Sequence, residues 1–328
     1  MTDGRVPAAA RAPGSSLAAI FPGQGSQRVG MGAQLKERDP GLFREHFGLA
    51  DDLAGAPISR YALEGPLEDL TRTEIAQPAI HALSIALWRL ARANGLRPEY
   101  LAGHSLGEFS AAVAGEALSR EDGMALVCFR ARVMAEAHHR SPGGMAAVIG
   151  LEPKRVAELC DEVASVGMVV VANVNAPHQV VTSGEHGALD ALTGLAIAAG
   201  AEEVRRLYVG AAFHSPLMEP VRQQLAAYAE GLEWREPSVP LVTVAGPVTS
   251  GNGIRDALVA QTTRPVDWLG CVRRLRALGC ETFLELGSGR VLTGLTKLID
   301  DEARTFSADS PERVDSVARQ LDASFIQA

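Results

Sequence analysis

The fold is decided by the stretch Gly103–Glu108, which reads GHSLGE. An apolar run at residues 98–102 leads into it, and a run of small, helix-forming residues at 110–114 follows it. This pattern predicts a strand, a sharp turn and a helix, with Ser105 at the apex of the turn. It matches the G-x-S-x-G nucleophile elbow, in which the glycines let the chain turn tightly enough to expose the serine hydroxyl.

The helix predicted after Ser105 adds a second feature of nucleophilic sites. Its free N–H groups and its positive end point toward negative charge that develops beside the serine oxygen. The alternative is an inert serine in a glycine-rich turn between a strand and a helix, because motifs this short recur by chance. The serine is therefore a candidate nucleophile whose partners must be sought elsewhere in the chain.

Length and composition indicate a globular protein with an acidic balance. The chain has 328 residues, enough for one large domain or two smaller ones, and 47% of them are hydrophobic against 21% charged. A formal net charge of −8 argues against nucleic acid as a partner. No apolar run approaches the length of a membrane span, so we expect no membrane contact.

The cysteines and the N-terminal residues bear on the cellular compartment. Cys128, Cys160, Cys271 and Cys280 lie in apolar patterns without a C-x-x-C pair, so we expect free thiols in a reducing compartment rather than a zinc site or disulfides. Residues 1–16 lack the apolar segment of a signal peptide and are expected to form a disordered tail. The sequence therefore predicts a cytoplasmic protein.

Strands and helices alternate along most of the chain, which is typical of a parallel, doubly wound sheet. Residues 17–142 and 210–310 are expected to form this α/β core, which we compare with the α/β-hydrolase fold. Residues 143–209 read β-α-β-β-α-β, the order of a ferredoxin-like unit, and are predicted to be a small inserted domain. A final helix or tail is expected at 311–328.

The expected core elements follow from hydrophobic periodicity. They are strands at Leu17–Phe21, Val239–Val244 and Thr282–Leu286, and helices from Thr73 through Leu90, at Arg120–Arg140 and at Leu217–Leu232. The first strand is followed by the loop Pro22–Gln27, which contains two glycines and two amides. Such a loop can offer backbone N–H groups to an anion, although an ordinary connection between a strand and a helix explains it equally well.

Two arginines on the predicted helix Arg120–Arg140 differ in their helical phase. At roughly 100° per residue, Arg130 falls among aliphatic side chains, whereas Arg132 falls elsewhere, four residues before Glu136. A guanidinium among aliphatic groups requires an anion, because burying it unpaired is costly. Arg130 is therefore the candidate for a function, although snorkelling or a structural carboxylate would also satisfy it.

A serine nucleophile needs a base, and the chain has eight histidines. His214 follows Phe213 on a loop where the chain returns from the small domain to the core. His104 is expected to point away from Ser105, because neighbouring residues diverge at the apex of a turn. The others lie in polar surroundings, at a helix end or on a core-facing helix. Exclusion therefore favours His214 as the general base without settling it.

Five blocks of sequence together resemble one family. They are Phe21–Gln27, Gly103–Glu108, Arg130 with Val133–Met134, Ala212–Pro216 and Gly294–Lys297. In this order and spacing they resemble the malonyl-CoA:acyl carrier protein transacylases and the acyltransferase domains of polyketide synthases. The resemblance runs from about Leu17 to Ile299, and it also implies the ferredoxin-like insertion.

The resemblance implies a role for each candidate residue. Ser105 would be the nucleophile and His214 its base, with the backbone carbonyl of Gln261 orienting the histidine where other enzymes use a carboxylate. The backbone N–H groups of Leu106 and Gln24 would form the oxyanion hole.

Further residues are implied to bind the substrate. Arg130 would pair with the free carboxylate of a malonyl group, and Gln77 would line the site. Asn173 and Asn175 resemble residues of the small domain that lie near the cleft. Malonyl-selective polyketide acyltransferases often carry His-Ala-Phe-His where this chain reads AAFH at 211–214. Phe213 still predicts a narrow floor that excludes an α-methyl branch.

The function implied by the resemblance is transfer of a malonyl group from malonyl-CoA to the phosphopantetheine thiol of an acyl carrier protein, through an ester on Ser105. It would serve fatty acid synthesis or a polyketide synthase supplied in trans, and we expect a monomer that needs no metal or prosthetic group. One alternative is an acyl-thioester hydrolase of the same fold, which would be expected to lack Arg130. The other is a non-catalytic module that docks a carrier protein, which would not require Ser105 or His214.

Overall fold

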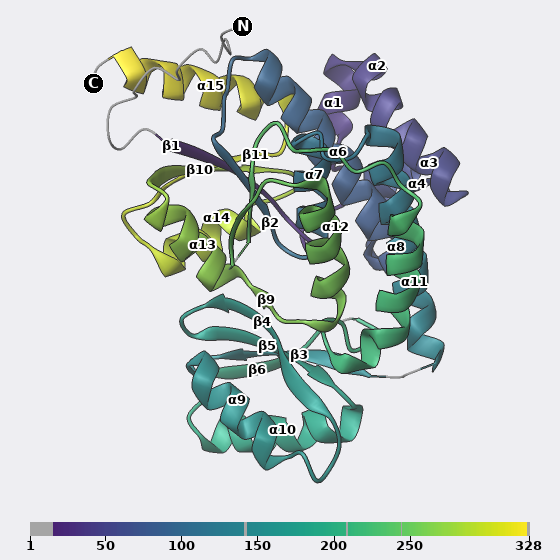
Figure 1. Cartoon of the computed structure of the whole chain (residues 1–328), viewed down its shortest axis with the longest axis vertical. Helices are drawn as coiled ribbons and strands as arrows, with labels where there is room; N and C mark the ends of the chain where they lie inside the picture. Colours follow the sequence, from purple (N-terminus) through teal and green to yellow (C-terminus); the bar gives the residue numbers. More distant parts are fainter. Residues whose placement is uncertain (1–15, 141–142, 208, 244, 327–328) are drawn as a thin grey trace, which may run out of the picture.

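The computed structural model describes residues 16–140, 143–207, 209–243 and 245–326, and Figure 1 shows their arrangement. A larger α/β unit lies above a smaller one in that view. The tail expected at 1–16 lies outside the described residues except for Ser16, which begins the first strand.

The larger unit is built on a six-stranded sheet. Its strands, in spatial order, are β11 (Arg304–Ala308), β10 (Cys280–Leu286), β1 (Ser16–Phe21), β2 (Tyr100–Gly103), β7 (Leu241–Thr243) and β8 (Gly246–Val248). The first five run parallel, and only β8 is antiparallel to its neighbour. The predicted mostly parallel core is therefore confirmed.

Strand β1 is buried on both faces, which explains its continuous apolar sequence. Leu17, Ala19 and Phe21 belong to one hydrophobic core, whereas Ala18 and Ile20 belong to another on the opposite face. The first core is closed by α6 (Thr73–Ala93), α7 (Leu106–Ala114) and α8 (Arg120–Arg140), and the second by α13 (Trp268–Ala277) and α14 (Val291–Ile299). Helices on both faces make the sheet doubly wound, as predicted.

The remaining helical segments surround this core (Figure 1). They are α1 (Ala33–Arg38), α2 (Pro40–Phe43), the π-helical turn η1 (Arg44–Gly48), α3 (Leu49–Ala54), α4 (Ile58–Glu64), α5 (Leu67–Thr71), the short turn η2 (Pro216–Met218), α11 (Glu219–Glu230), α12 (Gly251–Ala260), the turn η3 (Gln261–Thr263) and α15 (Pro311–Ile326).

The smaller unit has the predicted β-α-β-β-α-β order. Its elements are β3 (Gly144–Ile149), α9 (Pro153–Glu162), β4 (Val169–Ala176), β5 (Gln179–Gly184), α10 (His186–Ala198) and β6 (Glu203–Arg206). The strands pair antiparallel in the order β6-β3-β5-β4, and the two helices pack on one face around a separate hydrophobic core. This arrangement confirms the ferredoxin-like insertion.

One strand of the small sheet comes from outside the segment 143–209. Strand β9 (Val266–Asp267) begins three residues after the end of η3 and pairs in parallel with β4, with Val266 opposite Asn173. A pair of residues carries no periodicity, so this strand could not be predicted from the sequence. Its pairing ties the small sheet to the turn η3.

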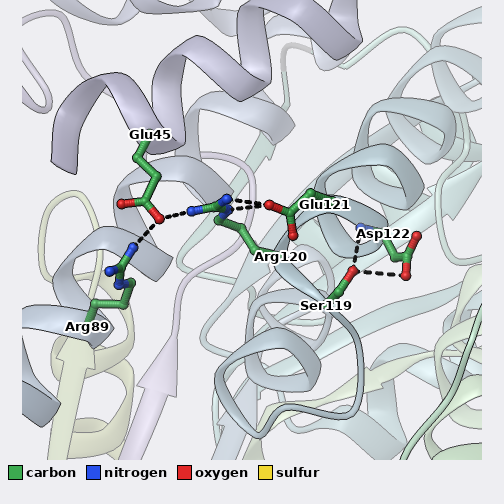
Figure 2. A network of polar contacts seen from close by, with 6 residues as sticks. All are labelled: Glu45, Arg89, Ser119, Arg120, Glu121 and Asp122. Atoms are coloured by element: carbon green, nitrogen blue, oxygen red, sulfur yellow. Dashed lines mark hydrogen bonds and ion pairs between the residues drawn. The ribbon is translucent and has the colours of Figure 1, made fainter. Parts of the chain in front are cut away.

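A network of polar side chains anchors the start of α8, the helix that carries Arg130. Figure 2 shows Glu45 of η1 in ion pairs with Arg89 of α6 and Arg120 of α8, and Arg120 also pairs with Glu121. The Asp122 backbone N–H donates to Ser119 Oγ at 3.0 Å, which caps the helix. Because these ion pairs are partly exposed, each adds little to stability.

Two further expectations concern the whole chain. All four cysteines are free, and burial raises the pKa of each thiol. Within the ranges that the structure describes, no helix has the length and apolar character needed to span a membrane.

Candidate active site

The turn at Ser105 has the geometry of a nucleophile elbow. Strand β2 ends at Gly103 and helix α7 begins at Leu106, and Ser105 between them has φ 52° and ψ −106°. A non-glycine residue with positive φ is strained, and such strain gathers at functional sites. A Cβ atom on Gly107 would lie 1.9 Å from the Phe21 carbonyl oxygen, so only glycine lets α7 approach β1 this closely.

His214 lies beside the serine, although 109 residues separate the two in sequence. Ser105 Oγ is 2.8 Å from His214 Nε2, and His214 Nδ1 is 2.8 Å from the backbone carbonyl oxygen of Gln261. Because a carbonyl only accepts, the ring carries its proton on Nδ1 and leaves Nε2 free to accept the serine proton. The imidazole is thereby held in the tautomer that a general base requires.

The surroundings of His214 keep its ring neutral. The residue is 5% exposed, and burial together with the positive charge of Arg130 lowers its pKa from 6.5 to about 3, although the bond to Gln261 acts in the opposite direction. At neutral pH the ring can therefore accept a proton at once.

Arg130 reaches the serine from α8. It is 1% exposed, and its Nη1 donates to Gln77 Oε1 at 2.7 Å while Nη2 donates to Ser105 Oγ at 3.0 Å. Burial lowers its pKa to about 10, so it stays charged at neutral pH. Arg132, in contrast, is exposed and lies over the ring of Phe129. The structure thus separates the two arginines in the way their helical phase predicts.

The loop after β1 and the start of α7 lie on either side of the serine. Gln24 lines the cleft, donates from Nε2 to Thr73 Oγ1 at 3.2 Å, and accepts at Oε1 from Gln77 Nε2 at 3.4 Å. Leu106 is the first residue of α7, and the first N–H groups of a helix have no partner within it. Phe213, which is 6% exposed, lines the same cleft beside His214.

His104 faces the small unit. Its Nε2 lies 2.9 Å from Asn175 Oδ1 and 3.3 Å from Asn173 Nδ2, both on β4. The elbow of the larger unit thus contacts the small sheet through one imidazole. Only the family resemblance predicted that these two asparagines lie near the cleft.

These residues line one cleft between the two units, with a volume of about 400 Å³. Its wall combines Ser105, Arg130 and His214 of the larger unit with Asn173 and Asn175 of the small one. This volume lies within the range of small-molecule sites. In the described part of the chain, no group of three histidine, cysteine or acidic residues could hold a metal ion.

One part of the site was not predicted from the sequence, namely the side-chain contacts behind His214. Gln261 donates from Nε2 to Glu108 Oε2 at 2.8 Å and to the Ser105 carbonyl oxygen at 3.1 Å. Burial raises the pKa of Glu108 to about 8, against the opposing charge of Arg130. The only signal in the sequence was the acidic residue three positions after the serine, on the first turn of the helix.

Comparison with known proteins agrees with this geometry. The family profile described as acyl transferase domain matches residues 19–288. The malonyl CoA-acyl carrier protein transacylase of Bacillus subtilis (strain 168) is 36% identical over 310 residues, which cover 94% of this chain and 98% of the relative.

Solved structures of the same kind superpose over nearly the whole chain. The malonyl-CoA:acyl carrier protein transacylase of Xanthomonas oryzae pv. oryzae has a TM-score of 0.88 and 42% identity, covering 94% of this chain and 98% of that one. A malonyl-transacylase solved in complex with a type II polyketide synthase acyl-carrier protein has a TM-score of 0.89 and 36% identity, covering 93% and 100%. The resemblance in the sequence is therefore confirmed, and the chain belongs to the acyltransferase family of the malonyl-CoA:acyl carrier protein transacylases.

Proposed function

We propose that this protein transfers a malonyl group from malonyl-CoA to the phosphopantetheine thiol of an acyl carrier protein, through an ester on Ser105. Its family membership supports the reaction. The observation that carries the assignment of residues is the position of Ser105 Oγ, within hydrogen-bond distance of a neutral His214 and a charged Arg130. A serine held between a base and a cation suits acyl transfer from a donor that carries a carboxylate.

The first half-reaction forms the ester. His214 Nε2 takes the hydroxyl proton as Ser105 Oγ attacks the thioester carbonyl carbon, and negative charge develops on the carbonyl oxygen. We assign the N–H groups of Leu106 and Gln24 to that oxyanion, because one begins α7 and the other lies in the facing loop. The carbon–sulfur bond then breaks, and the imidazolium of His214 gives its proton to the departing CoA thiolate.

The second half-reaction repeats these steps with another thiol. His214 removes the proton of the phosphopantetheine thiol, the sulfur attacks the ester carbonyl, and Ser105 leaves as an alcohol after regaining a proton. Two half-reactions through a covalent enzyme predict ping-pong kinetics. The relative solved in complex with an acyl-carrier protein supports a carrier protein as the acceptor.

Arg130 gives the site its preference for a carboxylated acyl group. A planar guanidinium can form two parallel, charge-assisted hydrogen bonds with one carboxylate. In the structure Gln77 orients the guanidinium from one side, and Phe213 closes the cleft near the serine. We assign Arg130 and Gln77 to the malonyl carboxylate, Phe213 to exclusion of an α-branch, and Asn173 and Asn175 to contact with the donor.

The two alternatives fit these observations less well. A non-catalytic docking module has no use for a serine and a histidine held in one hydrogen bond. A hydrolase does not need a buried cation beside its nucleophile. We further propose a monomer, because one chain supplies every side chain named above. A cytoplasmic location is consistent with four free thiols.

Mass spectrometry of the intact protein tests the proposal. After mixing with malonyl-CoA, we expect one malonyl adduct that maps to Ser105 and moves to an added acyl carrier protein faster than to water. The Ser105→Ala variant should fold normally and form no adduct. Release of free malonate at the same rate with and without carrier protein would favour the hydrolase, and no adduct at all would favour the docking module.

A further inference from the structure

We propose that Glu108 is a positioning residue for the base His214 and that it acts through Gln261. The inference deepens the proposed function, on which it rests, because it concerns how the same serine and histidine are held. Glu108 does not touch the serine hydroxyl or the imidazole in any contact described above. Its influence passes through a single glutamine.

Gln261 joins three parts of the site. Its side-chain Nε2 donates to Glu108 Oε2 at 2.8 Å and to the Ser105 carbonyl oxygen at 3.1 Å. Its own backbone carbonyl accepts from His214 Nδ1 at 2.8 Å. One residue thus binds the helix that follows the nucleophile, the turn that presents it and the ring that activates it.

The two acceptors determine how the Gln261 amide is oriented. The residue is 8% exposed, and among the described residues its Oε1 has no hydrogen-bond partner. Turning the amide over would place that oxygen against the Ser105 carbonyl oxygen, which can only accept, and would leave that carbonyl without a donor, which is unfavourable in a buried position. Glu108 and the Ser105 carbonyl therefore hold Nε2 in place.

Holding the side chain also restricts the backbone of Gln261. The residue lies where α12 ends and η3 begins, and its N–H donates back into α12. The side chain and the N–H fix the Cα atom, and the next peptide plane, which carries the carbonyl oxygen, is held in the turn η3 by a bond from the Arg264 N–H at 3.3 Å. That oxygen sets the direction of the His214 ring, and a misplacement of about 1 Å can cost a catalytic group about a hundredfold in rate.

A purely structural role for Glu108 makes a different prediction. A carboxyl group buried in the first turn of a helix can stabilise the fold through its packing and its hydrogen bond alone. In that case its removal would lower stability without changing the reactivity of a folded protein. The two roles can be separated by measuring the reactivity of Ser105 and the stability of the fold in the same variants.

The test uses an uncharged fluorophosphonate, which labels an activated serine and needs neither malonyl-CoA nor a carrier protein. Labelling rates are compared for wild type, Glu108→Ala, Glu108→Gln, Gln261→Met and the double variant Glu108→Ala/Gln261→Met, each first shown to be folded by its melting curve. Gln261→Met keeps the backbone carbonyl and the length of the side chain but removes the donor.

We expect Glu108→Ala and Gln261→Met each to slow labelling by about ten- to a hundredfold, on the scale of a slightly misplaced catalytic group. Glu108→Gln keeps an acceptor oxygen and should restore most of the rate. The double variant should be no slower than the slower single variant, because both changes break one connection.

Three results would overturn the proposal: effects that multiply in the double variant, a Glu108→Gln variant as slow as Glu108→Ala, or wild-type labelling in folded Gln261→Met. The last result is decisive even if Glu108→Ala does not fold. Wild-type protein that labels at Ser105 but transfers no malonyl group would contradict the proposed function and leave this inference standing.

Discussion

The two residues that meet at the reacting oxygen both have an unusual backbone. Ser105 has φ 52° and His214 has φ 57°, in the left-handed region that side chains disfavour. Each is held there by contacts of long sequence range, the serine by the packing of α7 on β1 and the histidine by the Gln261 carbonyl. The fold therefore maintains local strain at the position where the chemistry requires two side chains to converge.

The role of Arg130 predicts a change in substrate preference. Replacing Arg130 by alanine removes the guanidinium that we propose binds the malonyl carboxylate, and malonyl transfer should lose several kcal/mol of transition-state stabilisation, about the effect of breaking a buried charge pair from one side. Acetyl-CoA has no carboxylate, so its slow transfer should change little. The measurement is the ratio of kcat/KM for malonyl and acetyl donors in wild type and Arg130→Ala.

Arg132→Ala is the matched control for this prediction. It removes the same kind of side chain two residues along α8, from an exposed position. The ratio should stay at its wild-type value in this variant. An equal loss for both donors in Arg130→Ala would mean that the arginine supports the site without recognising the substrate.

The environment of His214 predicts the pH dependence of acylation. An ordinary histidine becomes protonated as the pH falls through about 6.5. A ring with a pKa of about 3 stays neutral in that pH range and can still act as a base. The rate of Ser105 acylation by acetyl-CoA should therefore stay nearly constant from pH 8 down to pH 5.5. Arg130→Ala should move the acid limb toward 6.5, because the arginine charge helps to lower the pKa. A wild-type rate that halves near pH 6.5 would contradict this account.

The site was only partly predictable from the sequence. Ser105 and Arg130 were found because a local motif and a helical phase marked them. His214 emerged by exclusion, and Gln261 came from the resemblance alone, because 47 residues separate it from the histidine it contacts. The contact between Gln261 and Glu108 spans 153 residues and involves side chains that no local pattern distinguishes.

At the scale of elements, the packing of α7 on β1 depends on the absence of one methyl group. Gly107→Ala would place a Cβ 1.9 Å from the Phe21 carbonyl oxygen, where the obstacle is backbone and cannot move aside. We expect a loss of at least about 1–3 kcal/mol in the free energy of unfolding, the usual cost of overpacking. The displaced helix should also abolish acylation of Ser105.

Gly194→Ala provides the comparison within another helix. Gly194 lies exposed in α10, and a Cβ there would meet no atom within 4 Å. The variant should gain about 0.5–1 kcal/mol from better helix propensity and keep full activity. Urea unfolding and acylation rates measure both variants. Equal stability in the two would mean that the contact at Gly107 is not a constraint.

The elements themselves were predictable in proportion to their length. The spacing of apolar residues predicted the observed bounds of α8, and β1 and β10 were predicted as strands. The two-residue strand β9 and the short hairpin strand β8 were not, because neither is long enough to show a period. Pairing with a distant strand, rather than local propensity, makes β9 a strand.

At the scale of the whole molecule, buried histidines make stability depend on pH. His81, His214 and His46 are almost completely buried, and burial lowers their pKa to about 3, 3 and 4. The unfolded chain binds protons at these residues near pH 6.5, whereas the native state does not. Each one therefore contributes stability that is present above pH 6.5 and is lost as the pH falls toward 4.

Buried carboxyl groups act with the opposite sign. The pKa of Glu108 is raised to about 8, and that of Glu285 is also raised, in both cases mainly by burial. In the folded protein each of these carboxyl groups keeps its proton at a pH at which the unfolded chain has already released it. Each group therefore contributes stability that is present below pH 4.5 and is lost as the pH rises through the folded pKa. The dependence of the unfolding free energy on pH sums the contributions of both kinds of group. The contribution of a single histidine is therefore best measured by substituting it.

His81 is suited to that test because it lies outside the active site, with Nδ1 2.9 Å from Ser110 Oγ. Between pH 6 and pH 5, His81→Asn should lose about 1.2 kcal/mol less unfolding free energy than wild type, since the wild-type chain binds nearly one more proton on unfolding in this range. His178→Asn, which removes a histidine from an exposed position, is the matched control. Urea unfolding at a series of pH values gives these slopes. Parallel lines for wild type and His81→Asn would show that the native state already binds a proton at His81, and the neutral, buried ring inferred here would be wrong.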